Sequence, residues 1–224
     1  DLANQAIHEK YTNKMVYRYD FTQFNRDGYS KDVKFLYNKE VHTEDQKRLL
    51  IVNAVALSEY RRLLAEREMK IDLKPVVLIK SVKIAQSEED RAFFDSVISS
   101  LRPDDLKRLQ ELGKENKDHE HEILKDMFAW LAEPKNGMVS QGDWNGLNKF
   151  VSEIRASFAH DNTLTYNSQK KEKAELLSQL DGPRNTIRAI FSVNALNEGW
   201  DVLSLYDIIH FDISKNKKVS LQDI

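Results

Sequence analysis

The chain has 224 residues, which is enough for one large domain with its own hydrophobic core. It has 34 Lys and Arg residues and 36 Asp and Glu residues, so its formal net charge is −2. The chain as a whole therefore does not attract nucleic acid by positive charge, and any basic binding surface must be local. The sequence has no cysteine, which excludes disulfides and thiolate metal sites and fits a reducing cytoplasm.

Residues 1–42 are predicted to form an N-terminal β-hairpin segment. Apolar and polar residues alternate over 16–24 and again over 29–37, which is the period of a strand with one buried face. The run Asn25-Arg26-Asp27-Gly28 lies between them, and Asp-Gly is a strong signal for a hairpin turn because both positions tolerate positive φ.

A long helix and a buried strand are predicted next. Thr43, with Gln46 three residues later, forms a capping box, and apolar residues follow at helical spacing to about Lys70. The run Pro75–Ser81 is short, apolar and rich in β-branched residues, with proline first, where a missing amide donor is tolerated. Such runs are typical of strands buried on both faces of a parallel sheet.

The middle of the chain is predicted to be mainly helical. Ser87 and Asp90 are expected to cap the next helix, and the charged stretch 102–142 is interpreted as a helical insertion. One more helix leads into a short candidate strand at 156–160, and a lysine-rich helix runs from 168 to about 180.

Two apolar segments, at 187–193 and 206–211, follow with a polar turn between them. The order after residue 73 is therefore strand, helices, strand, helix, strand, loop, strand. This alternation implies an α/β fold in which a parallel sheet is covered by helices on both faces. We expect residues 43–101 and 143–224 to form this core around the insertion.

The polar turn from Asn194 to Asp201 is the strongest candidate for a functional loop. Ligands of parallel α/β sheets bind at the carboxyl ends of strands, where this turn begins. Gly199 can adopt φ values closed to other residues and lets a phosphate or another backbone approach, and Asp201 is an acceptor suited to sugar hydroxyls. Composition alone leaves open an ordinary strand-end turn with an aspartate cap.

The residues of this turn resemble a known motif. The pattern from Asn194 to Asp201, N-x-L-x-E-G-x-D between two apolar strands, is similar to motif V of superfamily 2 helicases, in the form found in restriction-enzyme motor subunits and excision-repair helicases. The segment Lys74–Glu88 is similar to motif IV, and Asp27–Lys31 shows a weaker likeness. On these motifs, the sequence resembles the motor (Res) subunit of type III restriction enzymes.

The resemblance implies that the chain is the second RecA-like domain of a DNA motor. Such a domain forms a cleft for ATP with the first RecA-like domain and grips one nucleic-acid strand with its other loops. By resemblance, Gly199 and Asp201 would face the nucleotide, and Asn194 would lie near the nucleic-acid backbone. Lys80 and Ser81, at the end of the motif IV strand, would contact phosphates.

The resemblance also implies cofactors and partners. ATP and Mg²⁺ would be bound mainly by the first RecA-like domain, so no catalytic residue is expected within this chain. The implied partners are double-stranded DNA, the first RecA-like domain and, in a type III system, the methyltransferase (Mod) subunit, all in the cytoplasm. No membrane is expected, since no apolar run approaches the roughly 20 residues of a membrane span.

Three features depart from a complete motor. Val193 stands where many superfamily 2 members have a threonine, so a hydroxyl contact cannot be made there. The two glycines spaced as in a Walker A motif, Gly137 and Gly142, are followed by Asp143 where the motif needs lysine. The chain ends about where the arginine-rich motif VI would begin, so we expect an excised fragment that does not hydrolyse ATP alone.

Other functions stay open on sequence alone. A scaffold module could keep the RecA-like fold without hydrolysing ATP, and an excision-repair helicase would share the motif V pattern. Asp104 with Glu115-Asn116-Lys117 mimics the metal-binding signature of a nuclease, but the match lies in a charged helical block and is interpreted as chance. His119 and His121, two residues apart, cannot share one face of a helix, so a metal site there is not expected.

Overall fold

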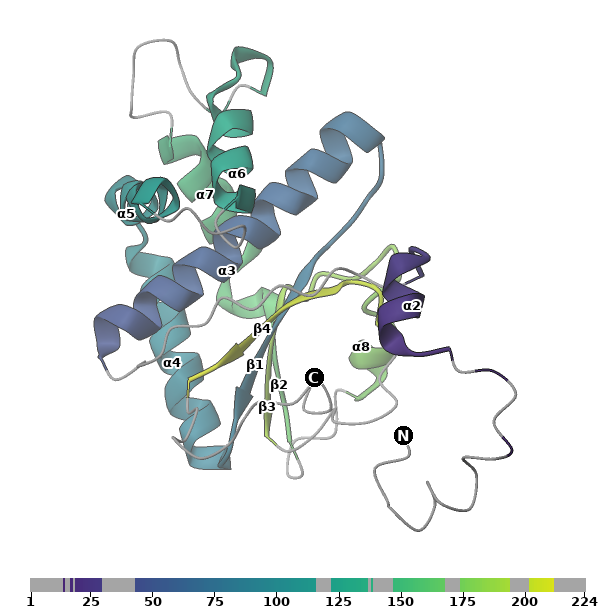
Figure 1. Cartoon of the computed structure of the whole chain (residues 1–224). Helices are drawn as coiled ribbons and strands as arrows, with labels where there is room; N and C mark the ends of the chain where they lie inside the picture. Colours follow the sequence, from purple (N-terminus) through teal and green to yellow (C-terminus); the bar gives the residue numbers. More distant parts are fainter. Residues whose placement is uncertain are drawn as a thin grey trace. The chain divides into compact units, whose positions relative to one another are not determined.

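The structure is a computed structural model that describes residues 14, 17, 19–29, 43–115, 122–136, 138, 147–167, 174–193 and 202–211 (Figure 1). The chain divides into two compact units, Asp1–Tyr37 and Asn38–Ile224. No helix within the described ranges is long and apolar enough to cross a membrane.

In the first unit, a short helix replaces the end of the first predicted hairpin strand and the start of the predicted turn. Helix α2 spans Phe21–Arg26, and the Asp20 carboxylate caps it by accepting a 3.0 Å hydrogen bond from the Gln23 N–H. Gly28 follows with a φ of +80°, so this glycine ends a helix instead of making a hairpin turn. The predicted β-hairpin is therefore wrong over 21–28, and the remainder of its second strand lies outside the described residues.

The long helix of the second unit is confirmed. Helix α3 spans Glu44–Leu64 and begins with the predicted capping box, in which the Thr43 hydroxyl accepts from the Gln46 N–H at 3.2 Å and the Gln46 side chain accepts from the Thr43 N–H at 3.1 Å. A π-helical turn, η2 at Ala65–Met69, extends α3, and Lys70 ends it with a φ of +58°. The helix therefore ends where the sequence predicted.

The second unit is built on a parallel sheet. Its strands in the described part of the chain are β1 (Val76–Ser81), β2 (Thr163–Tyr166), β3 (Ala189–Val193) and β4 (Leu205–His210). Their order is β2-β3-β1-β4, and every pairing between them is parallel. The predicted parallel sheet is thus confirmed, and β1, β3 and β4 lie close to their predicted positions.

Strand β2 starts later than predicted. The stretch 156–160, expected as a strand, contains the end of helix α7 (Leu147–Ser157) and the start of a 3-10 turn, η6 (His160–Asn162). The apolar spacing of α7 continues through Phe158, which is fully buried and packs edge-on against Phe94. The apolar face of α7 therefore continues in the core through residues that were predicted to form a strand.

The remaining helices follow the predicted order, with one correction. Helix α4 spans Ile84–Ser100, so Ser87 and Asp90, which were expected to cap it, lie inside it with buried side chains. The block predicted as a helical insertion contains α5 (Pro103–Glu115), α6 (Glu122–Ala132) and a 3-10 turn, η4 (Pro134–Asn136), while α8 (Ala174–Ser178) comes before β3. The boundaries of the insertion stay a prediction.

Helices cover both faces of the sheet, as predicted (Figure 1). Val77 and Ile79 of β1 pack into a large core with apolar side chains from α3, α4, α5, α6 and α7. Val76 and Leu78 point to the opposite face, because side chains alternate along a strand, and they pack with Leu177 of α8. The fold class, an α/β parallel sheet between helices, is therefore confirmed.

Helix α5 is docked on α3 by a bidentate ion pair. Arg48 donates from Nε to Asp105 Oδ1 at 2.9 Å and from Nη2 to Asp105 Oδ2 at 2.8 Å, and the Arg102 N–H also donates to Oδ2 at 2.9 Å. Partial burial raises the pKa of Asp105, but the hydrogen bonds from Arg48 and Arg102 outweigh burial and hold this pKa below its usual value.

We expect Asp105→Asn to lower the free energy of unfolding at pH 7 by about 1–3 kcal/mol, because hydrogen bonds to a charged group are lost. Since the pKa is lower in the folded state than in the unfolded state, the carboxylate stabilises the fold above the unfolded pKa and loses this contribution as the pH falls through the folded pKa. The difference from wild type should shrink below about pH 4. Chemical denaturation of both proteins at pH 7 and at pH 3 measures this difference in unfolding free energy. A difference of the same size at both pH values would contradict the stabilising role of the Asp105 carboxylate.

Candidate functional site

The carboxyl ends of β1 and β3 form the candidate site. The two strands are parallel neighbours, and Ser81, the last residue of β1, is in register with Val193, the last residue of β3. Their ends therefore meet at one edge of the sheet, where α/β proteins bind ligands. Residue Asn194 follows Val193 directly. The strand within the motif IV-like segment and the strand that leads into the motif V-like segment thus end side by side, as a shared site requires.

Two of the predicted site residues are described in the structure. Lys80 is half-buried near the end of β1, in register with residues of both neighbouring strands. Ser81 is 7% exposed, and its hydroxyl donates a 2.7 Å hydrogen bond to Asp90. The other predicted residues lie outside the described part of the chain: Asn194, Gly199 and Asp201.

Asp90 is a residue of this edge that sequence reasoning missed. It lies in α4 and is 3% exposed, and its carboxylate accepts from Ser81 Oγ at 2.7 Å and from Gln86 Nε2 at 3.0 Å. The spacing of four residues between Gln86 and Asp90 could have suggested that pair, because such residues share a helix face. No local pattern links Asp90 to Ser81. A buried carboxylate therefore faces the last residue of β1.

The first turn of α4 adds backbone donors to the same edge. Helix α4 begins at Ile84, shortly after β1, with no side-chain cap at Lys83 and no acidic residue in its first turn. The first N–H groups of a helix have no partner within the helix and carry a partial positive charge, which favours an anion. Lys83 is exposed beside them. The edge therefore offers cationic side chains and backbone donors suited to phosphate.

Strand β3 ends at this edge, and β4 starts at the opposite edge of the sheet. Strand β4 is parallel to β1, and its first residue, Leu205, is in register with Val76 at the start of β1. The far end of the segment is held by Asp181, whose carboxylate accepts from the N–H groups of Leu203 at 3.0 Å and Ser204 at 2.8 Å. The described residues on both sides of the motif V-like segment are therefore held in place.

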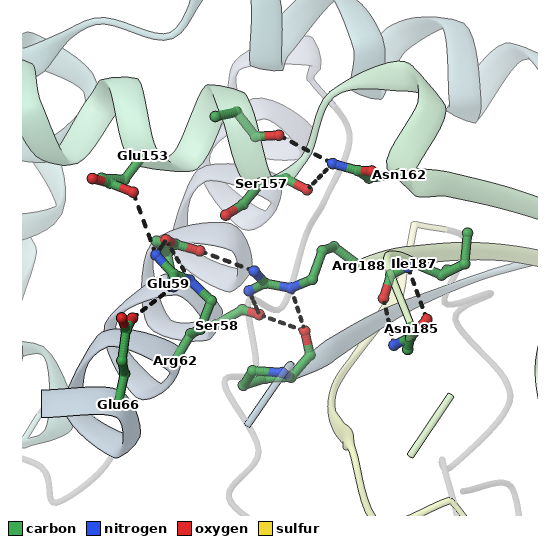
Figure 2. A network of polar contacts seen from close by, with 12 residues as sticks. Ser58, Glu59, Arg62, Glu66, Glu153, Ser157, Asn162, Asn185, Ile187 and Arg188 are labelled. Atoms are coloured by element: carbon green, nitrogen blue, oxygen red, sulfur yellow. Dashed lines mark hydrogen bonds and ion pairs between the residues drawn. The ribbon is translucent and has the colours of Figure 1, made fainter. Parts of the chain in front are cut away.

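A buried polar network lies at the starts of β1 and β3 (Figure 2). Arg188 is 4% exposed and donates from Nε to the Pro75 carbonyl at 2.9 Å, from Nη1 to Glu59 at 3.1 Å and from Nη2 to the Ser58 hydroxyl at 3.2 Å. Arg62 also donates to Glu59, at 2.6 and 2.8 Å. Desolvation lowers the pKa of Arg188, and the attraction of Glu59 opposes this shift. We interpret this buried network as structural: it holds α3 against the starts of β1 and β3.

The residues that mimic a nuclease signature do not come together. Asp104 and Glu115 lie in the first and last turns of α5, about 16 Å apart along the axis at 1.5 Å per residue, so one metal ion cannot be held by both. Within the residues that the structure describes, no group of three or more His, Cys, Asp or Glu side chains could hold a metal ion. His119 and His121 lie outside those residues.

Comparison with known proteins supports the resemblance to motor subunits. No protein-family model and no solved structure matches the chain. The chain is similar to the curated HindVIP Res subunit of Haemophilus influenzae, a probable type III restriction-modification enzyme. The two are 25% identical over an alignment 223 residues long, which covers 95% of this chain and 42% of that protein. The chain therefore spans less than half the length of this relative. The sequence-based resemblance to a type III Res subunit is confirmed by this similarity.

Proposed function

We propose that this chain is the second RecA-like motor domain of an ATP-dependent DNA translocase of the type III Res kind. The observation that carries the proposal is the parallel pairing of β1 with β3. It brings the end of the strand in the motif IV-like segment and the end of the strand before the motif V-like segment to one edge, beside the start of α4. The similarity to a Res subunit along 95% of the chain supports it. In such a motor, closure of two domains around ATP would move phosphate-gripping loops along double-stranded DNA.

Within this domain, one set of residues would grip DNA and another would face the nucleotide. Lys80, Ser81 and Asn194 are proposed to contact DNA phosphates, and the first backbone N–H groups of α4 would add to this grip. Gly199 and Asp201 are proposed to contact the nucleotide, with Asp201 accepting a hydrogen bond from a sugar hydroxyl. ATP and Mg²⁺ would be held mainly by the first RecA-like domain, so this chain would supply no catalytic base.

The whole protein would work with partners in the cytoplasm. The first RecA-like domain would complete the ATP cleft, and a Mod subunit or other domains would set the DNA sequence that is recognised. A full-length protein that binds DNA but shows no DNA-stimulated ATPase activity would instead support a non-catalytic binding module with the same fold.

Replacing Lys80 with alanine in the full-length protein should weaken DNA binding about 3- to 10-fold and reduce the slope of log affinity against log salt concentration by about one, because one phosphate contact is lost. Fluorescence anisotropy with a labelled duplex at several salt concentrations measures both quantities. Lys107→Ala is a matched control, because Lys107 is a surface lysine of α5 that pairs with Asp104. Equal behaviour of the two variants would remove Lys80 from the DNA interface.

A further inference from the structure

We infer that Asp90 competes with DNA phosphate for the proton of the Ser81 hydroxyl and thereby limits how tightly this edge binds DNA. The inference rests on the proposed function, in which Ser81 contacts a phosphate. Asp90 is a positioning residue in this account, since it acts through Ser81.

The competition follows from the hydrogen bond that Ser81 makes. Its Oγ lies 2.7 Å from Asp90 Oδ2, and since a carboxylate oxygen only accepts, the hydroxyl proton points to Asp90. A serine hydroxyl has one proton to donate, and phosphate oxygens also accept. Ser81 can therefore donate to a phosphate only by giving up its bond to Asp90.

Asp90 is held firmly in this position. Its side chain is 3% exposed, and its second oxygen, Oδ1, accepts a 3.0 Å hydrogen bond from Gln86. Because this carboxylate is buried and both its oxygens are bonded, it cannot turn away into solvent when a phosphate approaches Ser81. The competitor for the serine proton is therefore a fixed part of the edge.

The charge of Asp90 acts in the same direction. A phosphate oxygen bonded to Ser81 would lie about 2.7 Å from Oγ and so within about 5.4 Å of Asp90 Oδ2. Two negative groups at that separation repel, most strongly where side chains exclude water. A motor that steps along DNA has to release each phosphate after binding it. A carboxylate that weakens phosphate binding therefore suits a site that binds and releases DNA repeatedly.

Asp90→Asn in the full-length protein should bind a fluorescein-labelled DNA duplex about 3- to 10-fold more tightly than wild type. The asparagine N–H group can donate to Ser81 Oγ, which leaves the serine proton free for phosphate, and the negative charge is gone. A gain in affinity separates this role from a structural one, because a variant with a damaged fold would bind more weakly. Thermal unfolding of the variant checks that the fold is kept.

Two further variants locate the effect. In a Ser81→Ala background, Asp90→Asn should give a smaller gain, since no hydroxyl proton is left to release. Asp95→Asn is the matched control: it removes an acid from the same helix, but Asp95 pairs with His160 and not with Ser81. DNA affinity should therefore stay close to wild type in this control.

The outcomes separate the inference from the proposed function. If wild type binds DNA and Asp90→Asn binds equally or more weakly, the inference is overturned and the proposed function stands. An equal gain in Asp95→Asn would also overturn it, since loss of any negative charge on α4 would then explain the result. If wild type does not bind the duplex at all, the proposed function fails, and the inference fails with it.

Discussion

Replacing Glu59 with alanine should lower the free energy of unfolding by about 3–5 kcal/mol. Glu59 is fully buried in α3, and its carboxylate accepts hydrogen bonds from Arg188 and Arg62. Without Glu59, the Arg188 guanidinium would remain buried with its charge unpaired. Leaving one charge of a buried pair without its partner destabilises a protein strongly, because the lost solvation of that charge is no longer offset.

The surroundings of Arg188 prevent it from finding another carboxylate. Its guanidinium lies 4.8 Å from the centre of the Phe158 ring. Its other donors bond the Pro75 carbonyl and the Ser58 hydroxyl, the second of which is labelled in Figure 2. Among the described residues, Glu59 is the acid with which Arg188 forms an ion pair. By contrast, Arg62 also pairs with Glu66 at 2.9 Å and with Glu153 at 3.3 Å, so it keeps acidic partners when Glu59 is lost.

Chemical denaturation of wild type and variant measures the loss. The double variant Glu59→Leu with Arg188→Met should recover part of it, since apolar side chains of similar size cost less than one unpaired buried charge. Lys107→Ala breaks a surface pair, whose side chains are 44% and 83% exposed, and should change the free energy of unfolding by less than about 1 kcal/mol. If Glu59→Ala is as stable as Lys107→Ala, the buried pair does not support the fold as argued.

Local signals predicted the long helix and most of the sheet. The capping box of Thr43 and Gln46 acts within one helical turn, and β1 is a run of adjacent apolar residues, so each can be recognised from a few neighbours in the sequence. The side-by-side ends of β1 and β3 could also be expected, because crossover connections through helices keep strands parallel.

Predictions failed where one local pattern fits two structures. Asp27-Gly28 tolerates positive φ at the end of a helix as well as in a hairpin turn, and the cap supplied by Asp20 favours the helix. The start of β2 was placed too early, because the burial of Phe158 continues the apolar spacing of α7 beyond the point where a strand was expected.

Contacts between distant residues left no local signal. Ser81 bonds Asp90 nine residues later, and Arg188 meets Glu59 across 129 residues. Which pairs form depends on the register of the strands and on the face that each helix buries. Neither property can be read from neighbouring residues, so the buried carboxylate at the site edge was not predicted.

Asp201→Ala in the full-length protein should lower the kcat/KM of DNA-stimulated ATP hydrolysis about 10- to 100-fold while leaving the fold intact. The proposed role of Asp201 is to accept a hydrogen bond from a sugar hydroxyl of ATP and so to help place the nucleotide between the two motor domains. A rise in KM alone would mean that this contact forms on nucleotide binding, and a fall in kcat would mean that it forms as the domains close. Asp104→Ala, on the surface of α5, should leave both constants unchanged.

The fold should survive this substitution because the segment is anchored on both sides of Asp201. Strand β3 ends at Val193 in register with β1, and the two carboxylate oxygens of Asp181 hold the N–H groups of Leu203 and Ser204 at 3.0 and 2.8 Å. Asp181→Ala removes the second anchor and should lower the melting temperature, whereas Asp201→Ala should melt like wild type. An Asp201→Ala protein that melts like wild type and hydrolyses ATP at the wild-type rate would remove Asp201 from the nucleotide site. One that melts like Asp181→Ala would make its role structural.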